Sequence, residues 1–310
     1  AASVSKIEIL RNPSAKYDAA SSGGIVNIVL KKGIKLGSNG SVNAGYFQGV
    51  YATETAGFNI NKSTGKINSY LSYQFTNRKN YEELNSDRLI KTDSSLLAQR
   101  AYTTYPAINN YISAGIDIAF TKKFNINYDL RLTPNNNKSY ALNGIDIIKA
   151  PTGALTGKNQ SDINSRNNSF FMSNELSSTY KIDSTGSEWS VDLEYNYSRN
   201  NNTQLYSNYS YLPVKPSVLG DGTNKSNKNI FVVESELVLK MPKVFNIETG
   251  FKITRSNSHN SADYFTDTAG VGRKADRYQT NTFKYRETIS AFYLQVAKTF
   301  WGFTLKPGFR

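Results

Sequence analysis

Apolar and polar residues alternate along several long stretches of this sequence. Between residues 111 and 121, apolar side chains occupy every second position, and polar or charged side chains occupy the positions between them. The same period of two recurs over residues 124–132, 189–197, 231–241 and 245–253. Because successive side chains of a β-strand point to opposite faces, this pattern predicts strands with one apolar face and one polar face. The runs exceed the roughly five to six residues that are usual for strands of soluble proteins.

Charged residues fall in the middle of these predicted strands, and they share the polar face. A soluble sandwich would turn that face to water, whereas a transmembrane barrel would turn it into the lumen, because lipid faces the apolar side. Buried charges need partners, so we expect lumen charges to pair with one another, with a plug or with a solute. The candidates for the lumen face are Asp117, Asp129, Arg131, Asp192, Glu194, Glu234, Glu236, Glu248 and Lys252.

Short and long connections alternate between the predicted strands. If the strand near residues 40–50 runs outward and the strand at 54–62 returns, every short turn lies at the same end of the sheet. Outer-membrane barrels have short periplasmic turns and longer extracellular loops, whereas a soluble sandwich has no reason to separate loop lengths by end. The predicted short turns are 62–66, 121–123, 183–187, 241–243 and 300–302. The predicted long loops, rich in Asn, Ser, Gly and Asp, lie near 80–107, 135–168, 201–228 and 257–284.

Aromatic residues gather beside the short turns, where the interfacial girdle of a membrane barrel belongs. Lysines gather at the same end. Either anionic headgroups attract these lysines, or hairpin turns simply collect polar residues. The girdle candidates are Phe120, Phe124, Tyr180, Trp189, Phe245, Phe300 and Trp301.

Composition supports a membrane barrel over a disordered chain. Hydrophobic residues make up 38% of the 310 residues and the mean hydropathy is -0.50, yet aromatics reach 13%. Disordered chains are poor in aromatics, whereas a barrel embeds many rings and keeps a polar interior. No run of about 18 apolar residues exists, so the sequence predicts no membrane-spanning helix.

Several functional classes find no support in the residues. The chain has no Cys and one His, His259, so thiolate metal sites and His-rich metal sites are excluded. His259 lies in a predicted loop, without a nucleophile elbow, and Glu234 and Glu236 are more simply explained as lumen lining. The formal charge is +13, but the cations are spread along the chain and no nucleic-acid motif accompanies them. We therefore expect no enzymatic activity, no metal, no cofactor and no nucleic-acid partner.

The N-terminal segment has a different pattern. Two short apolar runs, residues 7–10 and 25–30, flank a polar stretch. Pro13 suits the first turn of a short helix with Asn12 as its cap. The glycine pair 23–24 suits a bend with positive φ before the second run. We expect a strand, a helical turn, a bend and a second strand.

Residues 4–32 resemble the closing motif of the plug domain in TonB-dependent receptors. The shared order is an acidic residue in a short strand, a cation, a Pro, a small residue, a Tyr, a Gly-rich bend and an Ile/Val-Asn-Ile strand. The sequence departs from the commoner pattern at Asn12 and Asp18, where Gly is usual, and Asn-Pro-Ser-Ala-Lys-Tyr-Asp resembles the Bacteroidetes-type branch. The motif residues, to which we assign structural roles, are Asn12, Pro13, Ser14, Tyr17, Gly23, Gly24 and Asn27. Asn27 interrupts an apolar strand, so we expect its side chain to be hydrogen-bonded.

The resemblance implies a TonB-dependent outer-membrane receptor in a Gram-negative bacterium, which imports siderophore-iron, cobalamin, a glycan or a peptide. It implies outer-membrane lipid, a TonB-type energy-transducing protein and a surface lipoprotein as partners. We expect residues 1–33 to be the end of the plug and residues 34–310 to be the first eleven or so strands of a barrel of about 22 strands. The plug start and the remaining strands would lie outside this sequence or in a second chain. The alternative is a barrel that does not transport and serves as a subunit or scaffold of a larger surface complex.

Overall fold

The computed structural model describes residues 4–10, 25–30, 37–241, 245–269, 271–301 and 303–310. These residues form two antiparallel sheets. The smaller sheet pairs β1 (Val4–Leu10) with β2 (Ile25–Leu30), in agreement with the two N-terminal strands predicted from the sequence. Among the described residues, no helix is long and apolar enough to cross a membrane.

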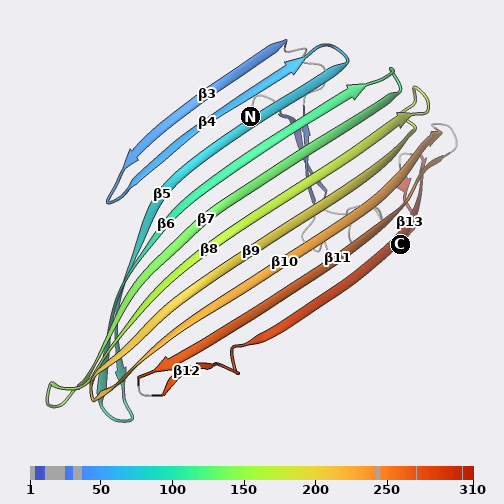
Figure 1. The fold of residues 1–310 in the computed structure, drawn as a ribbon. Coiled ribbons are helices and arrows are strands. Elements are labelled where there is room, and N and C mark those ends of the chain that lie inside the picture. Colours follow the sequence, from blue (N-terminus) through green and yellow to red (C-terminus); the bar gives the residue numbers. More distant parts are fainter. Residues whose placement is uncertain (1–3, 11–24, 31–36, 242–244, 270, 302) are drawn as a thin grey trace.

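The larger sheet is a continuous antiparallel meander in which long strands lie side by side in chain order (Figure 1). Its long strands are β3 (Ser38–Gln48), β4 (Ala52–Ser63), β5 (Ile67–Ile90), β6 (Ser95–Ala119), β7 (Phe124–Lys149), β8 (Ala154–Lys181), β9 (Glu188–Leu212), β10 (Val214–Met241), β11 (Phe245–Thr268) and β13 (Asn281–Phe300). Three short strands complete it, namely β12 (Gly272–Ala275) beside β11, and β14 (Phe303–Leu305) and β15 (Gly308–Phe309) beside β13.

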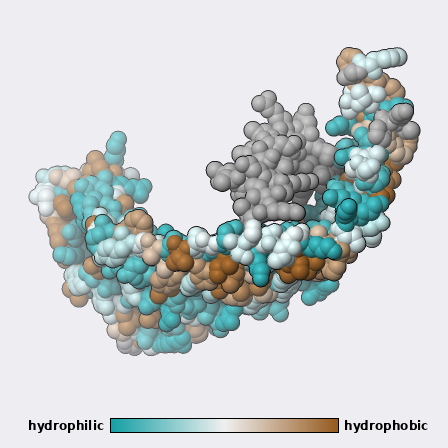
Figure 2. Space-filling view, turned by 90° about the horizontal axis from the view of Figure 1, so that it is seen from above, coloured by the Kyte–Doolittle hydropathy of each residue, from teal (hydrophilic) through white to brown (hydrophobic). Residues whose placement is uncertain are grey.

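The sheet is curved, and its two faces differ in chemistry. Seen from above, it forms an arc with hydrophobic residues along the convex side (Figure 2). The convex side chains include Trp189, Phe231 and Phe292, whose exposed fractions are 50%, 46% and 54%. Large apolar side chains this exposed are unfavourable in water but suit contact with lipid. The alternation in the sequence therefore becomes an apolar convex face and a polar concave face, as the barrel interpretation requires.

The prediction of long loops is wrong, because most of the residues assigned to these loops continue the strands. Residues 80–90 extend β5 and 95–107 begin β6, and only residues 91–94 connect them. The stretches near 135–168, 201–228 and 257–284 are likewise mostly strand, with connections such as 150–153 and Pro213. A strand of about 9–11 residues crosses a membrane, so β7, with 26 residues, extends well beyond it. We call this part of β5 to β13 the polar extension.

The extension lacks the period-two pattern because both of its faces meet water, so its Asn, Ser and Thr residues show no alternation. Its strands are still held by the same backbone ladder, and the register of β10 with β11 is unbroken from Val218↔Thr268 to Met241↔Phe245. Arg273 on β12 also forms a bidentate pair with Asp221 on β10, at 3.0 and 2.9 Å. This hydrogen-bonded pair lowers the pKa of the Asp221 carboxyl below its ordinary value.

The short turns are confirmed where the structure describes them. Residues 64–66 join β4 to β5, residues 120–123 join β6 to β7, and residues 182–187 join β8 to β9. The Phe120 and Phe124 rings stack beside their turn with centroids 5.8 Å apart. Because these turns share one end of the sheet, they mark the periplasmic side, opposite to the polar extension.

The turn at 182–187 is organised by one carboxylate. Asp183 Oδ1 accepts hydrogen bonds from the Thr185 backbone N (2.9 Å), the Thr185 hydroxyl (2.7 Å) and the Ser187 backbone N (3.0 Å). These bonds hold the pKa of Asp183 well below its usual range. Gly186 provides the positive φ of 98° that the turn needs.

We expect Asp183→Ala to destabilise this turn, because three donors lose their shared acceptor. The stabilisation by Asp183 should be complete above its unfolded pKa of about 3.9, begin to decrease below that pH, and be lost as the pH falls through the lower folded value. Heat-dependent gel migration of the folded protein at pH 7 and at pH 3 measures both effects. The wild type and the variant should unfold at more similar temperatures at pH 3, and an equal difference at both pH values would contradict the role of the carboxylate.

Candidate functional site

The concave face of the membrane part carries a band of carboxylates. All nine residues predicted for the lumen face lie on this face, as the strand registers show. The structure adds an acidic residue that the sequence interpretation missed, Glu175 on β8. The band therefore holds eight carboxylates with Arg131 and Lys252 among them. We call this set of ten residues the lumen band.

The centre of the lumen band is a row of three carboxylates on adjacent strands. Asp129 on β7 is directly opposite Glu175 on β8, which is directly opposite Glu194 on β9. The Tyr70 hydroxyl on β5 donates a hydrogen bond to Asp129 Oδ1 across the intervening strand. Asn196 Nδ2 donates to Glu194 Oε1 at 2.5 Å. Because like charges directly opposite each other repel, this row strongly favours a cation or a hydrogen-bond donor in front of it.

A mixed row follows toward the C-terminal strands. Asp192 on β9 faces Glu234 on β10, and Glu234 faces Lys252 on β11. Lys252 Nζ lies 2.9 Å from Glu234 Oε2, and their side chains are 40% and 26% exposed. An ion pair with this much solvent access is worth little to folding, so it shapes the surface rather than stabilising the sheet. The prediction that lumen charges pair with one another is thus confirmed for this pair.

The next positions pack an aromatic ring into the band. Glu236 on β10 faces Gly250 on β11, and Gly250 faces Tyr293 on β13, whose side chain is 2% exposed. Glu248 on β11 faces Gln295, which is 6% exposed. The glycine leaves the space in which the Tyr293 ring lies over the sheet. The Tyr293 ring therefore lies flat on the concave face of the sheet, near the carboxylates of Glu236 and Glu248.

Asp117 marks the opposite margin of the lumen band. Asn68 Nδ2 donates to its Oδ2 at 3.3 Å, whereas its Oδ1 is buried without a hydrogen-bond partner. The residues around it, Asn39, Asn61 and Asn127, are amides. This margin offers hydrogen-bond donors and acceptors in place of charge, so it can contact neutral polar groups.

Three lumen residues were missed by the sequence interpretation: Tyr70, Glu175 and Tyr293. Tyr70 shares its face of β5 with Asn68 and Ser72, and this pattern is the signal that places it on the polar face. Glu175 lies on the face of β8 opposite to Met172 and Leu176. Asn174, a polar residue, lies between these two on the lipid side and interrupts the apolar pattern. Two polar residues on the apolar face, Asn174 and Ser178, hide the alternation of β8.

The lumen band has the chemistry of a binding wall. Among the described residues, no group of three His, Cys, Asp or Glu has the arrangement of a metal site. His259, expected in a loop, lies within β11 on the convex face, away from the band. The band can therefore hold cationic or hydroxyl-rich groups by charge and hydrogen bonds, and the role of each of its residues stays a prediction.

Most of the N-terminal motif lies outside the described residues, namely Asn12, Pro13, Ser14, Tyr17, Gly23 and Gly24. Asn27 lies in β2, opposite Glu8 of β1. The hydrogen bond expected for Asn27 stays a prediction.

Comparison with known proteins agrees with the architecture of the large sheet. Residues 180–310 match the family model described as an outer membrane protein beta-barrel family. No curated protein matches the chain. The match spans the end of β8 and all later strands, which are the strands with the apolar convex face described above. The protein is thus an all-β outer-membrane protein whose large antiparallel sheet has the architecture of a β-barrel wall.

Proposed function

We propose that this chain is part of a TonB-dependent outer-membrane receptor that imports a scarce solute. The observation that carries the proposal is the N-terminal motif: two paired strands, β1 and β2, flank a segment with the plug sequence pattern, directly before the first barrel strand. A plug next to a wide barrel is the arrangement of active outer-membrane transporters, since a plugged lumen needs an energy source to open.

Charge supports a plug inside this wall. Residues 1–36 contain six Lys or Arg against two Asp or Glu. The lumen band contains eight carboxylates against two cations. Opposite net charges favour association of the two segments in a site with little water, because each reduces the repulsion within the other. On this proposal, the carboxylates first contact the plug and then the solute as the plug moves.

A scaffold role is the second candidate, and the polar extension favours it. Strands β5 to β11 present a broad sheet of Asn, Ser, Thr and Tyr beyond the membrane, together with exposed apolar side chains such as Leu89, Leu142 and Leu205. A surface lipoprotein or another subunit could dock on this sheet. The two candidates differ in whether the energy-transducing protein is required.

Growth on a single limiting nutrient separates these roles. We would compare the wild type, a strain lacking this gene and a strain lacking the TonB-type protein on siderophore-iron, cobalamin, a glycan or a peptide. Transport predicts that both deletions abolish growth on the same nutrient. A deletion of this gene that grows normally on every nutrient, while a surface complex is lost, would support the scaffold and overturn the transporter.

Within the full-length protein, we expect Glu175→Gln combined with Glu194→Gln to reduce energy-dependent uptake by about a hundredfold or more while leaving assembly intact. The reason is that both changes remove charge from the central carboxylate row and keep its shape, and two charge-assisted contacts are worth on the order of 1.5–3 kcal/mol each. Uptake of the labelled nutrient and heat-dependent gel migration are measured in parallel. The matched control is Asp146→Asn with Asp263→Asn, on the outward face of the extension. Equal uptake by the two double variants would remove the lumen band from the mechanism.

A further inference from the structure

The convex face bears a patch of cations directly beyond its apolar belt, on the extracellular side. We define the cationic patch as Arg199 on β9, Lys225 on β10, Arg255 on β11, and Lys284 and Arg286 on β13. We propose that this patch binds the phosphate groups of a glycolipid of the outer leaflet. The proposal depends on the outer-membrane location and not on transport.

Strand registers bring these residues together. Arg199 is opposite Asn227, which is opposite His259, which is opposite Lys284, in one row across four strands. In the next row toward the membrane, Asn229 on β10 and Asn257 on β11 precede Arg286. Arg255 lies one row closer still, and Lys225 lies one row further out. The patch is therefore compact, although its residues span almost ninety positions of the chain.

Around the patch, the outward positions of these strands hold no carboxylate, and the outward carboxylates Asp221 on β10 and Asp263 on β11 lie farther from the membrane. The absence of carboxylates applies to every second residue over 189–211 of β9, 223–241 of β10, 245–261 of β11 and 282–300 of β13, within the described residues. The acidic residues of the same strands, such as Glu234 and Glu248, point into the lumen. A net positive field thus faces outward at the level of the patch, and it attracts anions over about a Debye length.

The height of the patch matches the boundary of the membrane. Tyr197 and Ile253 lie two positions closer to the periplasmic end than Arg199 and Arg255. They form the extracellular end of the apolar belt, the band of apolar side chains on the convex face. Phe231 and Ile253 are 46% and 39% exposed on this belt. An acyl chain that lies along the belt places its headgroup against the patch. A free anion has no such chain, so the geometry favours a lipid as the source of the phosphate.

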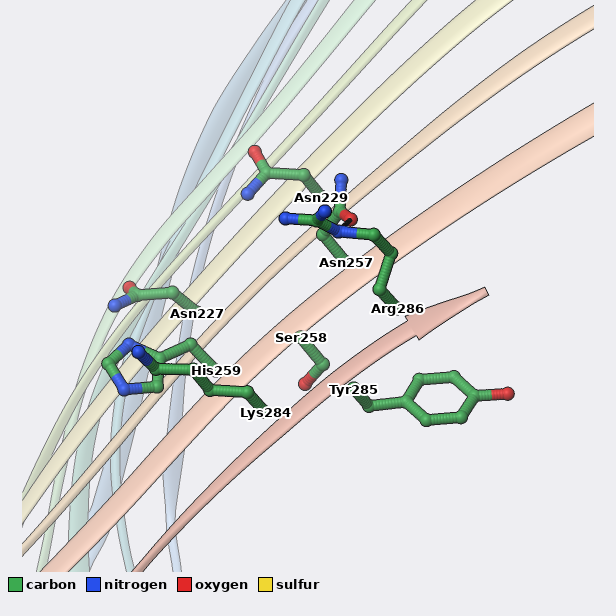
Figure 3. Close-up of a pocket in the computed structure, with 8 residues that line it drawn as sticks. All are labelled: Asn227, Asn229, Asn257, Ser258, His259, Lys284, Tyr285 and Arg286. Carbon is green, nitrogen blue, oxygen red and sulfur yellow. Dashed lines mark hydrogen bonds between the residues drawn. The ribbon is translucent and has the colours of Figure 1, made fainter. Parts of the chain in front are cut away.

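Two residues of the patch, Lys284 and Arg286, line a recess of about 420 Å³ together with Asn227, Asn229, Asn257 and His259. Figure 3 shows Asn229, Asn257 and Arg286 pointing toward one another at one end, and Asn227, His259 and Lys284 gathered at the other, whereas Tyr285 points away. Arg286 Nε donates to Asn257 Oδ1 at 3.1 Å, which orients the guanidinium and leaves its terminal NH groups available. Guanidinium groups bind phosphate through two parallel hydrogen bonds, and amide NH₂ groups add further donors. The recess is thus a built site for a tetrahedral anion.

The test uses the full-length protein in detergent, titrated with lipid A that carries two phosphates. We expect Lys284→Gln with Arg286→Gln to weaken binding about thirtyfold, because the double variant removes two cations that face the charged lipid surface. Retained labelled lipid and the rise in unfolding temperature are measured at low and high salt. The control is Lys228→Gln with Lys298→Gln, which removes the same charge from the lumen face and from the periplasmic end of the convex face.

The proposal requires binding of phosphorylated lipid A that weakens with salt, falls in the patch variant and is unchanged in the control. Equal loss in both double variants would overturn the site in favour of general electrostatic attraction. Equal binding of lipid A without phosphates would show that the apolar belt alone holds the lipid. If inorganic phosphate at millimolar concentration raises the unfolding temperature as much as the lipid does, the source is a free anion and the lipid assignment is wrong.

Discussion

An aspartate in place of Leu130 or Leu193 is expected to prevent stable assembly of the barrel. Both leucines lie on the convex face, at mid-height of the strands between the periplasmic turns and the polar extension, and Leu193 is 36% exposed. A charge near the membrane midplane costs about 2–4 kcal/mol for Arg or Lys and less for Asp. Native proteins have only about 5–15 kcal/mol of stability, so one such charge removes a large part of it.

The neighbouring residue provides the control for this prediction. Glu194→Ala changes the side chain next to Leu193, but on the lumen face, where it removes one of three adjacent carboxylates. We expect this variant to assemble normally. The measurement is the heat-resistant migration that folded outer-membrane barrels show on gels. Normal migration of the Leu130→Asp protein would reverse the assignment of the two faces.

Gly250→Ala should cause the second large loss of stability. A Cβ at Gly250 would fall against the Ser235 carbonyl oxygen, and it would come 2.7 Å from the Tyr293 hydroxyl. The backbone oxygen is held in the ladder and cannot move aside, so the strands must separate. Overpacking of this kind costs typically 1–3 kcal/mol and sometimes more. Thermal unfolding of the refolded protein measures the loss, and Gly144→Ala is the control because its nearest obstacle is the Arg100 carbonyl oxygen at 3.8 Å.

A second glycine, Gly115, tests whether the loss of stability depends on the kind of atom that the new Cβ meets. At Gly115 the obstacles are side chains, the Tyr70 ring and Asp129 Oδ1, the latter at 2.6 Å. We expect Tyr70→Ala to restore part of the stability lost in Gly115→Ala. In contrast, Tyr293→Ala should not rescue Gly250→Ala, because the Ser235 carbonyl oxygen remains. Rescue in both pairs would mean that the tyrosine rings alone set the cost.

The membrane part of this fold is largely predictable from its sequence. Lipid imposes a strict alternation on β6, β7, β9, β10 and β11, and that alternation identified both the strands and the polar face that the nine predicted residues share. The short turns were predictable for the same reason, because they interrupt the alternation and contain residues such as Gly65 and Gly186 with positive φ.

The polar extension was not predictable in this way. Water on both faces removes the selection for alternation, so Asn136 and Asn137 are equally acceptable on either side of β7. What holds these strands is backbone pairing that any non-proline residue can make, and local sequence does not report it. The cationic patch was hidden for a related reason, since its members are separated in sequence and meet only through the register of four strands.

The polar extension has a mechanical consequence. A ladder of hydrogen bonds runs without interruption from Met241 at the periplasmic end of β10 to Val218 far outside the membrane. Bending such a sheet strains many hydrogen bonds at once. The polar extension is therefore rigid, and its strands do not move independently as flexible loops would. A force applied at its outer end is transmitted along the strands to the level of Glu234 and Lys252.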